Sequence, residues 1–265
     1  AKIDTNNAQK GSIDLPTQFS EPVRTDLILR AVIAIQKNRR QKYGALPGAG
    51  LRAQAKLSRR RRDYKTSYGI GISRVPRKIL SHRGTRFNWV AAVAPGTTKG
   101  RRAHPPKASK NWEDRINKKE NRKAIRSAIA ATVSKDLVTK RGHHVPEIYP
   151  FIMDESIENI TKAKDLEKVL LTLGFERELE RSSQKKIRAG RGKNRGRPYK
   201  KRKGILIVVS QDCPLLISGK NLPGIDIVKV QQLNAELLAP GALPGRVTLW
   251  SERAIARLSQ ERLFA

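Results

Sequence analysis

Cations are the most numerous side chains in this 265-residue sequence that could take part in chemistry, and they gather in two runs. Twenty Lys and Arg residues lie between Asn38 and Trp112, where Asp63 is the one acid, and twelve lie in Arg181–Lys203 without any acid. The rest of the chain holds 24 bases and 22 acids, so the two runs carry nearly all of the net charge of +33. Cations at this density attract a polyanion whose phosphates they can neutralise.

Aromatic side chains lie among the cations of the first run and narrow the choice of polyanion. They are Tyr43, Tyr64, Tyr68, Phe87, Trp89 and Trp112. Cations bind phosphates and aromatic rings stack on unpaired bases, so the combination favours single-stranded or irregular RNA. The alternative interpretation is a solvated linker that its own charges repel and extend.

Residue types used in catalysis and metal binding show no matching pattern. No His-x-x-x-His spacing connects the four histidines, which are His82, His104, His143 and His144. The pair His143 and His144 follows Gly142, a position that favours cap or phosphate contacts, and the single cysteine, Cys213, is interpreted as core packing. Asp154 and Glu155 end a predicted strand without a base, nucleophile or metal ligand beside them, which indicates a solvated turn. We therefore expect no enzymatic activity, no metal and no cofactor.

Glycine-rich phosphate loops of nucleotide-binding proteins are not matched either. Gly69-Ile70-Gly71 follows no predicted strand, has no third glycine and is not followed by an acid about 20 residues later. The segment 188–197 carries glycines between arginines but no Gly-Lys-Ser/Thr ending, so it resembles an Arg/Gly RNA-binding tract more than a Walker loop.

The elements that must position these side chains predict an α/β body with a mostly parallel sheet flanked by helices. Short apolar runs without alternation predict buried strands at 151–153, 205–209, 225–230 and 247–249. An amino-terminal hairpin is expected from 2–4 and 12–15. Helices are predicted from Thr25, from Asn111 to Gly142, and at 161–173, 176–186, 234–238 and 251–263, with Thr25, Asn111 and Ser251 as N-caps.

The first basic run is rich in Gly and Pro and shows no sustained helix or strand period. We expect a single body over 1–265 into which 38–112 is inserted as a long extended basic loop that threads RNA, either disordered or folded against its partner. The second run, 181–203, is expected to form a further basic connection, extended from Arg188 onward.

Targeting features are few. No run of 18 apolar residues is present, Ala1–Lys10 lacks the apolar stretch of a signal peptide, and one cysteine suits a reducing compartment. We expect a cytoplasmic protein that does not enter a membrane.

Five segments, in order along the chain, resemble the archaeal and eukaryotic form of large-subunit ribosomal protein four, a universal ribosomal protein family. They are Leu15–Val32, Ser73–Arg77, Gly100–Lys107, Ile116–Thr132 and Gly192–Lys200. Little resemblance is found in 43–71 and 88–98. The resemblance implies an α/β body bound to large-subunit ribosomal RNA, with an extension that helps to form the wall of the nascent polypeptide exit tunnel. It also implies neighbouring large-subunit proteins and the nascent chain as partners, and no small-molecule substrate.

Residues expected to bind ribosomal RNA come from both runs and from the helix after the first. They are Arg39, Arg40, Lys56, Arg59, Arg60, Arg61, Arg62, Arg83, Arg86, Trp89, Arg101, Arg102, His104, Lys107, Lys118, Lys119, Arg122, Arg191, Lys193, Arg195, Arg197, Tyr199 and Lys200. The inserted loop reaches farthest near its midpoint, around residue 75. A tunnel-facing tip is therefore expected at Tyr68, Ile70, Ser73, Arg74 and Arg77, with Arg74 and Arg77 as cationic contacts. The alternative is a tip buried entirely in RNA.

Two other classes of protein share some of these features. An RNA-processing enzyme could hold its substrate with the basic loop, but it would need a catalytic constellation. A DNA-packaging protein would need neither the interleaved aromatic residues nor an α/β body.

Overall fold

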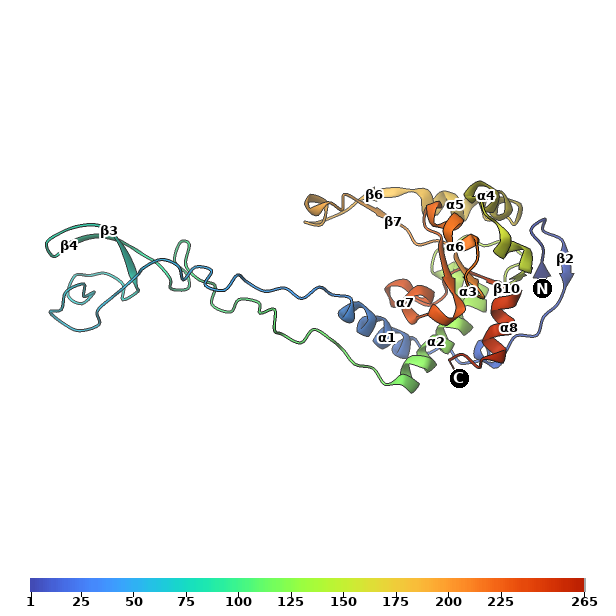
Figure 1. Cartoon of the computed structure of the whole chain (residues 1–265), viewed down its shortest axis with the longest axis horizontal. Coiled ribbons are helices and arrows are strands. Elements are labelled where there is room, and N and C mark those ends of the chain that lie inside the picture. The colour runs from blue at the N-terminus through green and yellow to red at the C-terminus, as the bar shows by residue number, and fades with distance from the viewer. Residues whose placement is uncertain (265) are drawn as a thin grey trace. The chain divides into compact units, whose positions relative to one another are not determined.

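A computed structural model describes residues 1–264, and the chain divides into two compact units (Figure 1). The body comprises 1–39 and 113 onward, and the inserted unit comprises Arg40–Trp112. Each unit has its own secondary structure and is described by itself.

The body is built on a six-stranded sheet in the order β2-β1-β5-β10-β8-β9. Every neighbouring pair is parallel except β1 and β2. The strands are β1 (Lys2–Ile3), β2 (Gln9–Gly11), β5 (Ile152–Met153), β8 (Leu206–Val209), β9 (Asp226–Lys229) and β10 (Thr248–Ser251). The predicted mostly parallel α/β sheet is thus confirmed, and a strand is present in each of the four predicted segments. Three of them are buried as predicted, whereas β9 is only partly buried because it lies at the edge of the sheet.

Helices cover both faces of the sheet and make a three-layer body. They are α1 (Thr25–Asn38), α2 (Lys118–Val133), α3 (Lys135–Lys140), α4 (Ala163–Thr172), α5 (Glu176–Ser183), α6 (Leu215–Ser218), α7 (Ala235–Leu238) and α8 (Glu252–Gln260). A short 3-10 turn precedes α1 at Thr17–Phe19, and others lie between later elements at Glu155–Asn159, Gly219–Asn221, Val230–Gln232 and Pro240–Ala242.

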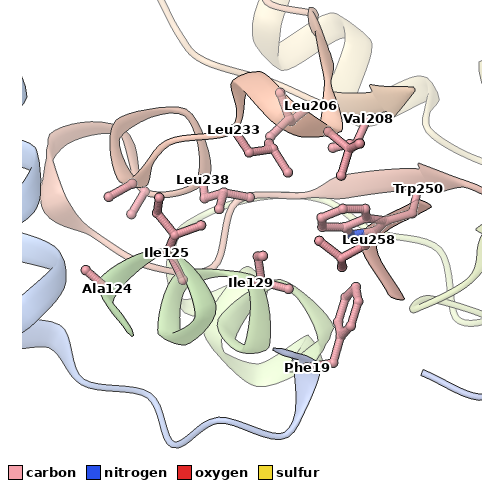
Figure 2. Close-up of a cluster of buried hydrophobic side chains, with 14 of the residues drawn as sticks. Phe19, Ala124, Ile125, Ile129, Leu206, Val208, Leu233, Leu238, Trp250 and Leu258 are labelled. Atoms are coloured by element: carbon pink, nitrogen blue, oxygen red, sulfur yellow. The ribbon is translucent and has the colours of Figure 1, made fainter. Parts of the chain in front are cut away.

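Alternate residues of the central strands feed two separate cores. Leu206 and Val208 of β8 pack with α1, α2, α7 and α8, where Phe19 meets the Trp250 ring edge-on at 5.1 Å (Figure 2). Ile207 of the same strand packs on the opposite face, against residues of α4 and α6. Because both faces are covered, β5 and β8 are apolar at every position, which is why their sequences do not alternate.

Several predicted boundaries of the body are wrong for local reasons. The second strand of the amino-terminal hairpin is β2, not 12–15, because the chain turns back early at Asn7, whose φ is +64°. Thr25 is the first residue of α1 and not its cap. Ser251 does cap α8, since its Oγ accepts the Ala254 N–H at 3.2 Å.

The long helix expected from Asn111 to Gly142 is also wrong. Asp114 does not start a helix, because its carboxylate pairs with Lys37 at 2.7 Å and its N–H donates to the Asn38 side chain at 2.9 Å. The helical region begins at α2 and is interrupted at Ser134, whose backbone is extended, before α3.

The second basic run folds differently from the extended connection that the sequence predicts. Helix α5 stops at Ser183, and β6 (Lys185–Ile187) pairs antiparallel with β7 (Tyr199–Lys201) across a 3-10 turn at Lys193–Arg195. Gly190 and Gly196 adopt positive φ values of 78° and 77°, which let the chain reverse.

The inserted unit contains one hairpin that the sequence analysis missed. Strands β3 (Arg77–Arg83) and β4 (Arg86–Ala91) pair antiparallel, and Gly84, with φ of +58°, lies in the tight turn between them. Along β4 the residues alternate between exposed and half-buried, a two-residue period that the surrounding Gly and Pro obscured. The rest of 40–112 consists of turns, bends and isolated bridges.

Candidate nucleic-acid interface

The inserted unit holds far more positive charge than it can neutralise. Nineteen of its residues are Lys or Arg, and Asp63 is its one acid. The Asp63 carboxylate accepts the Ser58 hydroxyl at 2.5 Å and the Tyr64 N–H at 2.8 Å, and these hydrogen bonds lower the pKa of Asp63. The positive charge of this unit can therefore be neutralised only by an anion from outside the unit.

The side chains predicted to bind RNA lie at the surface. Trp89 is half-buried, and the other predicted RNA-binding residues are all exposed. Some have a contact within their unit: Arg39 pairs with Glu236 at 2.5 Å, and the Arg40 guanidinium lies 4.3 Å from the Trp112 ring centroid. In the segment 191–200 the hairpin β6–β7 brings its cations together on one projection of the body.

An aromatic cluster gives the inserted unit a surface on which bases can stack. Phe87 and Trp89, two residues apart on β4, stack with centroids 5.0 Å apart, and Tyr64 meets Phe87 edge-on at 5.1 Å. A hollow of about 380 Å³ lies beside them, and Lys65 and Arg86 also line it. Rings rimmed by cations are a usual arrangement for an unpaired nucleobase and its phosphate.

A second aromatic pair joins the two ends of the inserted unit. Tyr43 stacks on Trp112 at a centroid distance of 5.1 Å, and Lys110 lies 4.7 Å from the Trp112 centroid. These contacts join the two ends of the inserted segment. Tyr43 and Trp112 are 69 residues apart in the sequence, so no local pattern could identify them as a pair.

The residues expected at the tip differ in exposure. Ile70 is 55% exposed, and the exposed Arg74 places its guanidinium 4.4 Å from the Tyr68 centroid. Arg77 is 8% exposed and donates to the Ser73 carbonyl and hydroxyl at 2.5 and 2.8 Å. Arg77 thus fixes the turn in which the exposed Ser73 and Arg74 lie.

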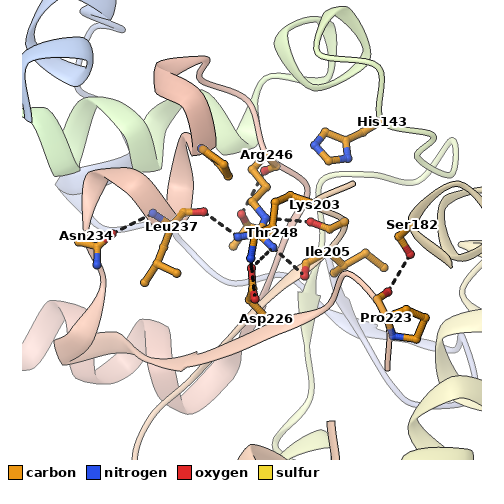
Figure 3. Close-up of polar contacts among 12 residues, drawn as sticks. His143, Ser182, Lys203, Ile205, Pro223, Asp226, Asn234, Leu237, Arg246 and Thr248 are labelled. Carbon is orange, nitrogen blue, oxygen red and sulfur yellow. Dashed lines mark hydrogen bonds and ion pairs between the residues drawn. The ribbon is translucent and has the colours of Figure 1, made fainter. Parts of the chain in front are cut away.

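Buried polar groups in the body form two networks that sequence reasoning missed. Arg246, which is fully buried, donates to the carbonyls of Gly204 and Leu237 at 2.8 and 2.9 Å and to Asp226 at 2.6 Å (Figure 3). Lys203 also pairs with Asp226, at 2.9 Å. No sequence pattern marks a buried arginine, because its partners lie on other elements.

The second network contains His143, which the sequence placed at a cap or phosphate. His143 is buried, its Nδ1 lies 2.7 Å from Glu178 Oε1, and Arg181 Nη2 lies 2.5 Å from the same oxygen. Burial lowers the pKa of His143, so its neutral Nδ1–H donates to the carboxylate. Burial opposes ionisation of Glu178, but the hydrogen bonds from Arg181 and His143 outweigh it and lower its pKa to about 2.

Acidic groups at the carboxyl end of the sheet, where an α/β enzyme would place its site, are occupied by structural contacts. Glu158 is buried and accepts the Ser210 N–H and hydroxyl, each at 2.9 Å, and the Ser251 hydroxyl at 2.5 Å. Asp154, expected in a solvated turn, is instead paired with Lys2 at 2.9 Å and with Lys10 at 3.2 Å. Within residues 1–264, no group of three or more His, Cys, Asp or Glu side chains is arranged to hold a metal. Over the same residues, no helix has the length and apolar character needed to span a membrane.

Comparison with known proteins gives a consistent match over nearly the full chain. Residues 13–261 match the model of the ribosomal protein L4/L1 family. The large ribosomal subunit protein uL4 of Nanoarchaeum equitans is 51% identical over 258 residues, covering 97% of this chain and 96% of that protein. Those of Archaeoglobus fulgidus and Halobacterium salinarum are 43% and 38% identical, over 94% and 97% of this chain and 93% and 97% of their own.

Proposed function

This chain belongs to the ribosomal protein L4/L1 family, and we propose that it is a structural component of the large ribosomal subunit that binds large-subunit ribosomal RNA. The observation that carries the RNA-binding part is the inserted unit, which combines nineteen cations and a single acid with an aromatic cluster beside Lys65 and Arg86. Its relatives are ribosomal proteins, and the chain is not an enzyme.

The two kinds of side chain have separate roles in this proposal. Exposed cations such as those of 59–62 neutralise backbone phosphates and set the affinity. The rings of Tyr64, Phe87 and Trp89 accept unpaired bases, which distinguishes irregular RNA from a regular duplex. Neighbouring large-subunit proteins are the further partners that a place in the subunit entails.

Salt dependence of RNA binding tests this proposal. If six to ten phosphates are neutralised, affinity for large-subunit RNA is expected to fall about 10³- to 10⁵-fold between about 50 and 200 mM salt. Replacing Arg59, Arg60, Arg61 and Arg62 together with Gln should reduce the slope of log K against log salt by about three. The charge-matched control replaces four exposed body lysines, Lys162, Lys164, Lys168 and Lys220, and should keep the parent slope. Equal slopes in both variants would show that the inserted unit is not part of the RNA interface.

We also propose that the inserted unit helps to form the wall of the nascent polypeptide exit tunnel. The segment 68–77 combines exposed Ile70, Ser73 and Arg74 with a turn that Arg77 holds by hydrogen bonds, so it presents a fixed, mixed apolar and cationic surface. Such a surface suits a passing peptide of any sequence better than a closed binding site does.

Photocrosslinking tests the tunnel proposal. A photoreactive residue at Ile70 or Arg74, in subunits carrying a stalled nascent chain, should label that chain. The same residue at Lys164 on the body is the control and should not. Labelling of ribosomal RNA alone from both tip positions would contradict the tip assignment and leave the RNA-binding role intact.

A further inference from the structure

A second hollow, of about 500 Å³, lies on the body next to the hairpin β6–β7. One side is formed by Arg141, His143 and Arg181, and the other by Lys186 and residues 200–203 of the hairpin; Pro240, Gly241 and Leu243 complete it. We call it the basic hollow. All of its lining residues belong to the body, so its geometry does not depend on the inserted unit.

Two of the three arginines that line the basic hollow are held in place by hydrogen bonds. Arg181 donates through Nε and Nη2 to Glu178 at 2.8 and 2.5 Å and through Nη2 to the Lys203 carbonyl at 2.7 Å. Arg141 donates through Nη2 to the Pro240 carbonyl at 2.6 Å. Oriented guanidinium groups lose little further freedom when an anion arrives, which favours binding.

The basic hollow is lined by more positively charged side chains than there are carboxylates paired with them. Seven lining residues are Lys or Arg, and the two carboxylates that pair with any of them are Glu178, on Arg181, and Asp226, on Lys203. Arg141 has no carboxylate partner, and its buried Nη1 has no hydrogen-bond acceptor. Burial, together with the nearby charges of Arg246 and Arg181, lowers the pKa of Arg141 to about 10. An anion in the hollow would relieve this repulsion.

The hairpin adds to the imbalance. Lys186 lies directly opposite Lys200, and Lys185 directly opposite Lys201. Alternation along each strand puts Lys186 and Lys200 on one face, while Lys185 is on the other, with its ammonium 4.7 Å from the Tyr199 centroid. Like charges directly across a strand pair destabilise it, so an external anion beside Lys186 and Lys200 would stabilise this hairpin.

We propose that the basic hollow binds one phosphate group and that a backbone phosphodiester of the ribosomal RNA supplies it. The inference rests on the proposed function and adds a defined contact on the body, separate from the inserted unit. Phosphate suits the site because its oxygens accept charge-assisted hydrogen bonds from several Lys and Arg side chains at once. Residues Arg141, Arg181 and Lys186 thereby join the RNA interface, while Glu178 and His143 act as positioning residues for Arg181.

The test uses the full-length chain with Lys186→Gln and Lys200→Gln together. Its control, Lys164→Gln with Lys220→Gln, removes the same charge from exposed positions outside the hollow. The hollow variant should bind large-subunit RNA more weakly than the control, with a salt slope lower than the parent's by about one. It should melt no lower than the parent, because a like-charge pair has been removed. Equal salt slopes in all three proteins would overturn the proposal.

A second measurement separates RNA from free phosphate as the source and needs no RNA. Inorganic phosphate should raise the melting temperature of the parent and the control, and raise it less in the hollow variant. An equal rise in all three proteins would overturn the hollow as a phosphate site. A smaller rise in the hollow variant, with an unchanged RNA salt slope, would overturn the RNA backbone as its source. If the parent prefers large-subunit RNA no more than unrelated RNA, the proposed function fails, while the phosphate measurement still decides whether the hollow binds phosphate.

Discussion

At the scale of single residues, the body depends on buried charges that only tertiary structure could have paired. Glu178 illustrates this, because its carboxylate contacts His143 and Arg181 and also accepts the His144 N–H at 3.1 Å. His143 and Glu178 are 35 residues apart in the sequence. At neutral pH these contacts stabilise the ionised Glu178 carboxylate, and protonation of the carboxylate removes that stabilisation.

The pair predicts a specific acid sensitivity. The pKa of Glu178 is lowered to about 2 in the folded protein, so its contribution is present above its unfolded value near 4.5 and is lost as pH falls toward 2. This shift corresponds to about 3 kcal/mol of stability. Because the pKa of His143 is also lowered, its contribution declines as pH falls below the unfolded value near 6.5.

Thermal melting against pH checks this expectation. Glu178→Gln should destabilise the protein by about 3 kcal/mol or more at pH 7, because Arg181 loses its buried partner, and should flatten the loss of stability below about pH 4.5. Glu176→Gln, on an exposed position of the same helix, should change stability by less than about 0.5 kcal/mol. An acid limb as steep in Glu178→Gln as in the parent would contradict the assignment.

The residue types and exposure of the candidate interface could be predicted from the sequence, whereas the residues that support it could not. Cations in a run with a single acid are expected to be exposed, since few of their charges can be paired nearby, and those of 59–62 are exposed. Arg77 is the exception, because a carbonyl and a hydroxyl four residues earlier satisfy its guanidinium. Arg246 and His143 could not be assigned, since their environments depend on how the sheet and helices assemble.

At the scale of elements, local sequence signals identified the strands and helices but not their pairing. Buried strands such as β8 could be predicted because a continuous apolar run of four or five residues is typical of a strand that is covered on both faces in an α/β layer. The hairpins were harder to predict from the sequence. In β6–β7 four of the six residues are lysines, so the hydrophobic period that usually marks a strand is absent there. In β3–β4 the two-residue period is confined to β4 and lies among Gly and Pro. The break at Ser134 between α2 and α3 also lacks a Gly or Pro signal.

The inserted unit is expected to be dispensable for folding of the body. Neither hydrophobic core contains a residue of 40–112. The two ends of the body at the insertion are also held together, by the Lys37–Asp114 ion pair and the Asn38–Asp114 hydrogen bonds. A variant in which 41–110 is replaced by a short Gly/Ser linker should therefore keep a cooperative thermal transition. Val32→Asp, which buries a charge in the core, is the control that should lose it.

Circular dichroism measures both variants on the same scale. The linker variant should keep the helical signal of α1–α8, because those helices lie wholly in the body. Loss of its cooperative transition would show that the inserted unit belongs to the folding core.

At the scale of the whole molecule, charge is divided between parts with different tasks. The body outside the two basic runs is nearly neutral and carries both hydrophobic cores, while the runs carry almost all of the excess of 33 positive charges. Self-repulsion of this size is unfavourable in isolation and is relieved by a polyanion. Membership in a family of large-subunit ribosomal proteins identifies that polyanion with ribosomal RNA in the proposed function.

Co-sedimentation with ribosomal subunits tests this central claim most directly. Ribosomes from a cell extract are washed at moderate salt, and their subunits are separated on a gradient. The chain is then quantified in each fraction against known large-subunit proteins. We expect one copy per large subunit, retained through the wash, with none on the small subunit. Recovery at the top of the gradient, or with chromosomal DNA, would contradict it.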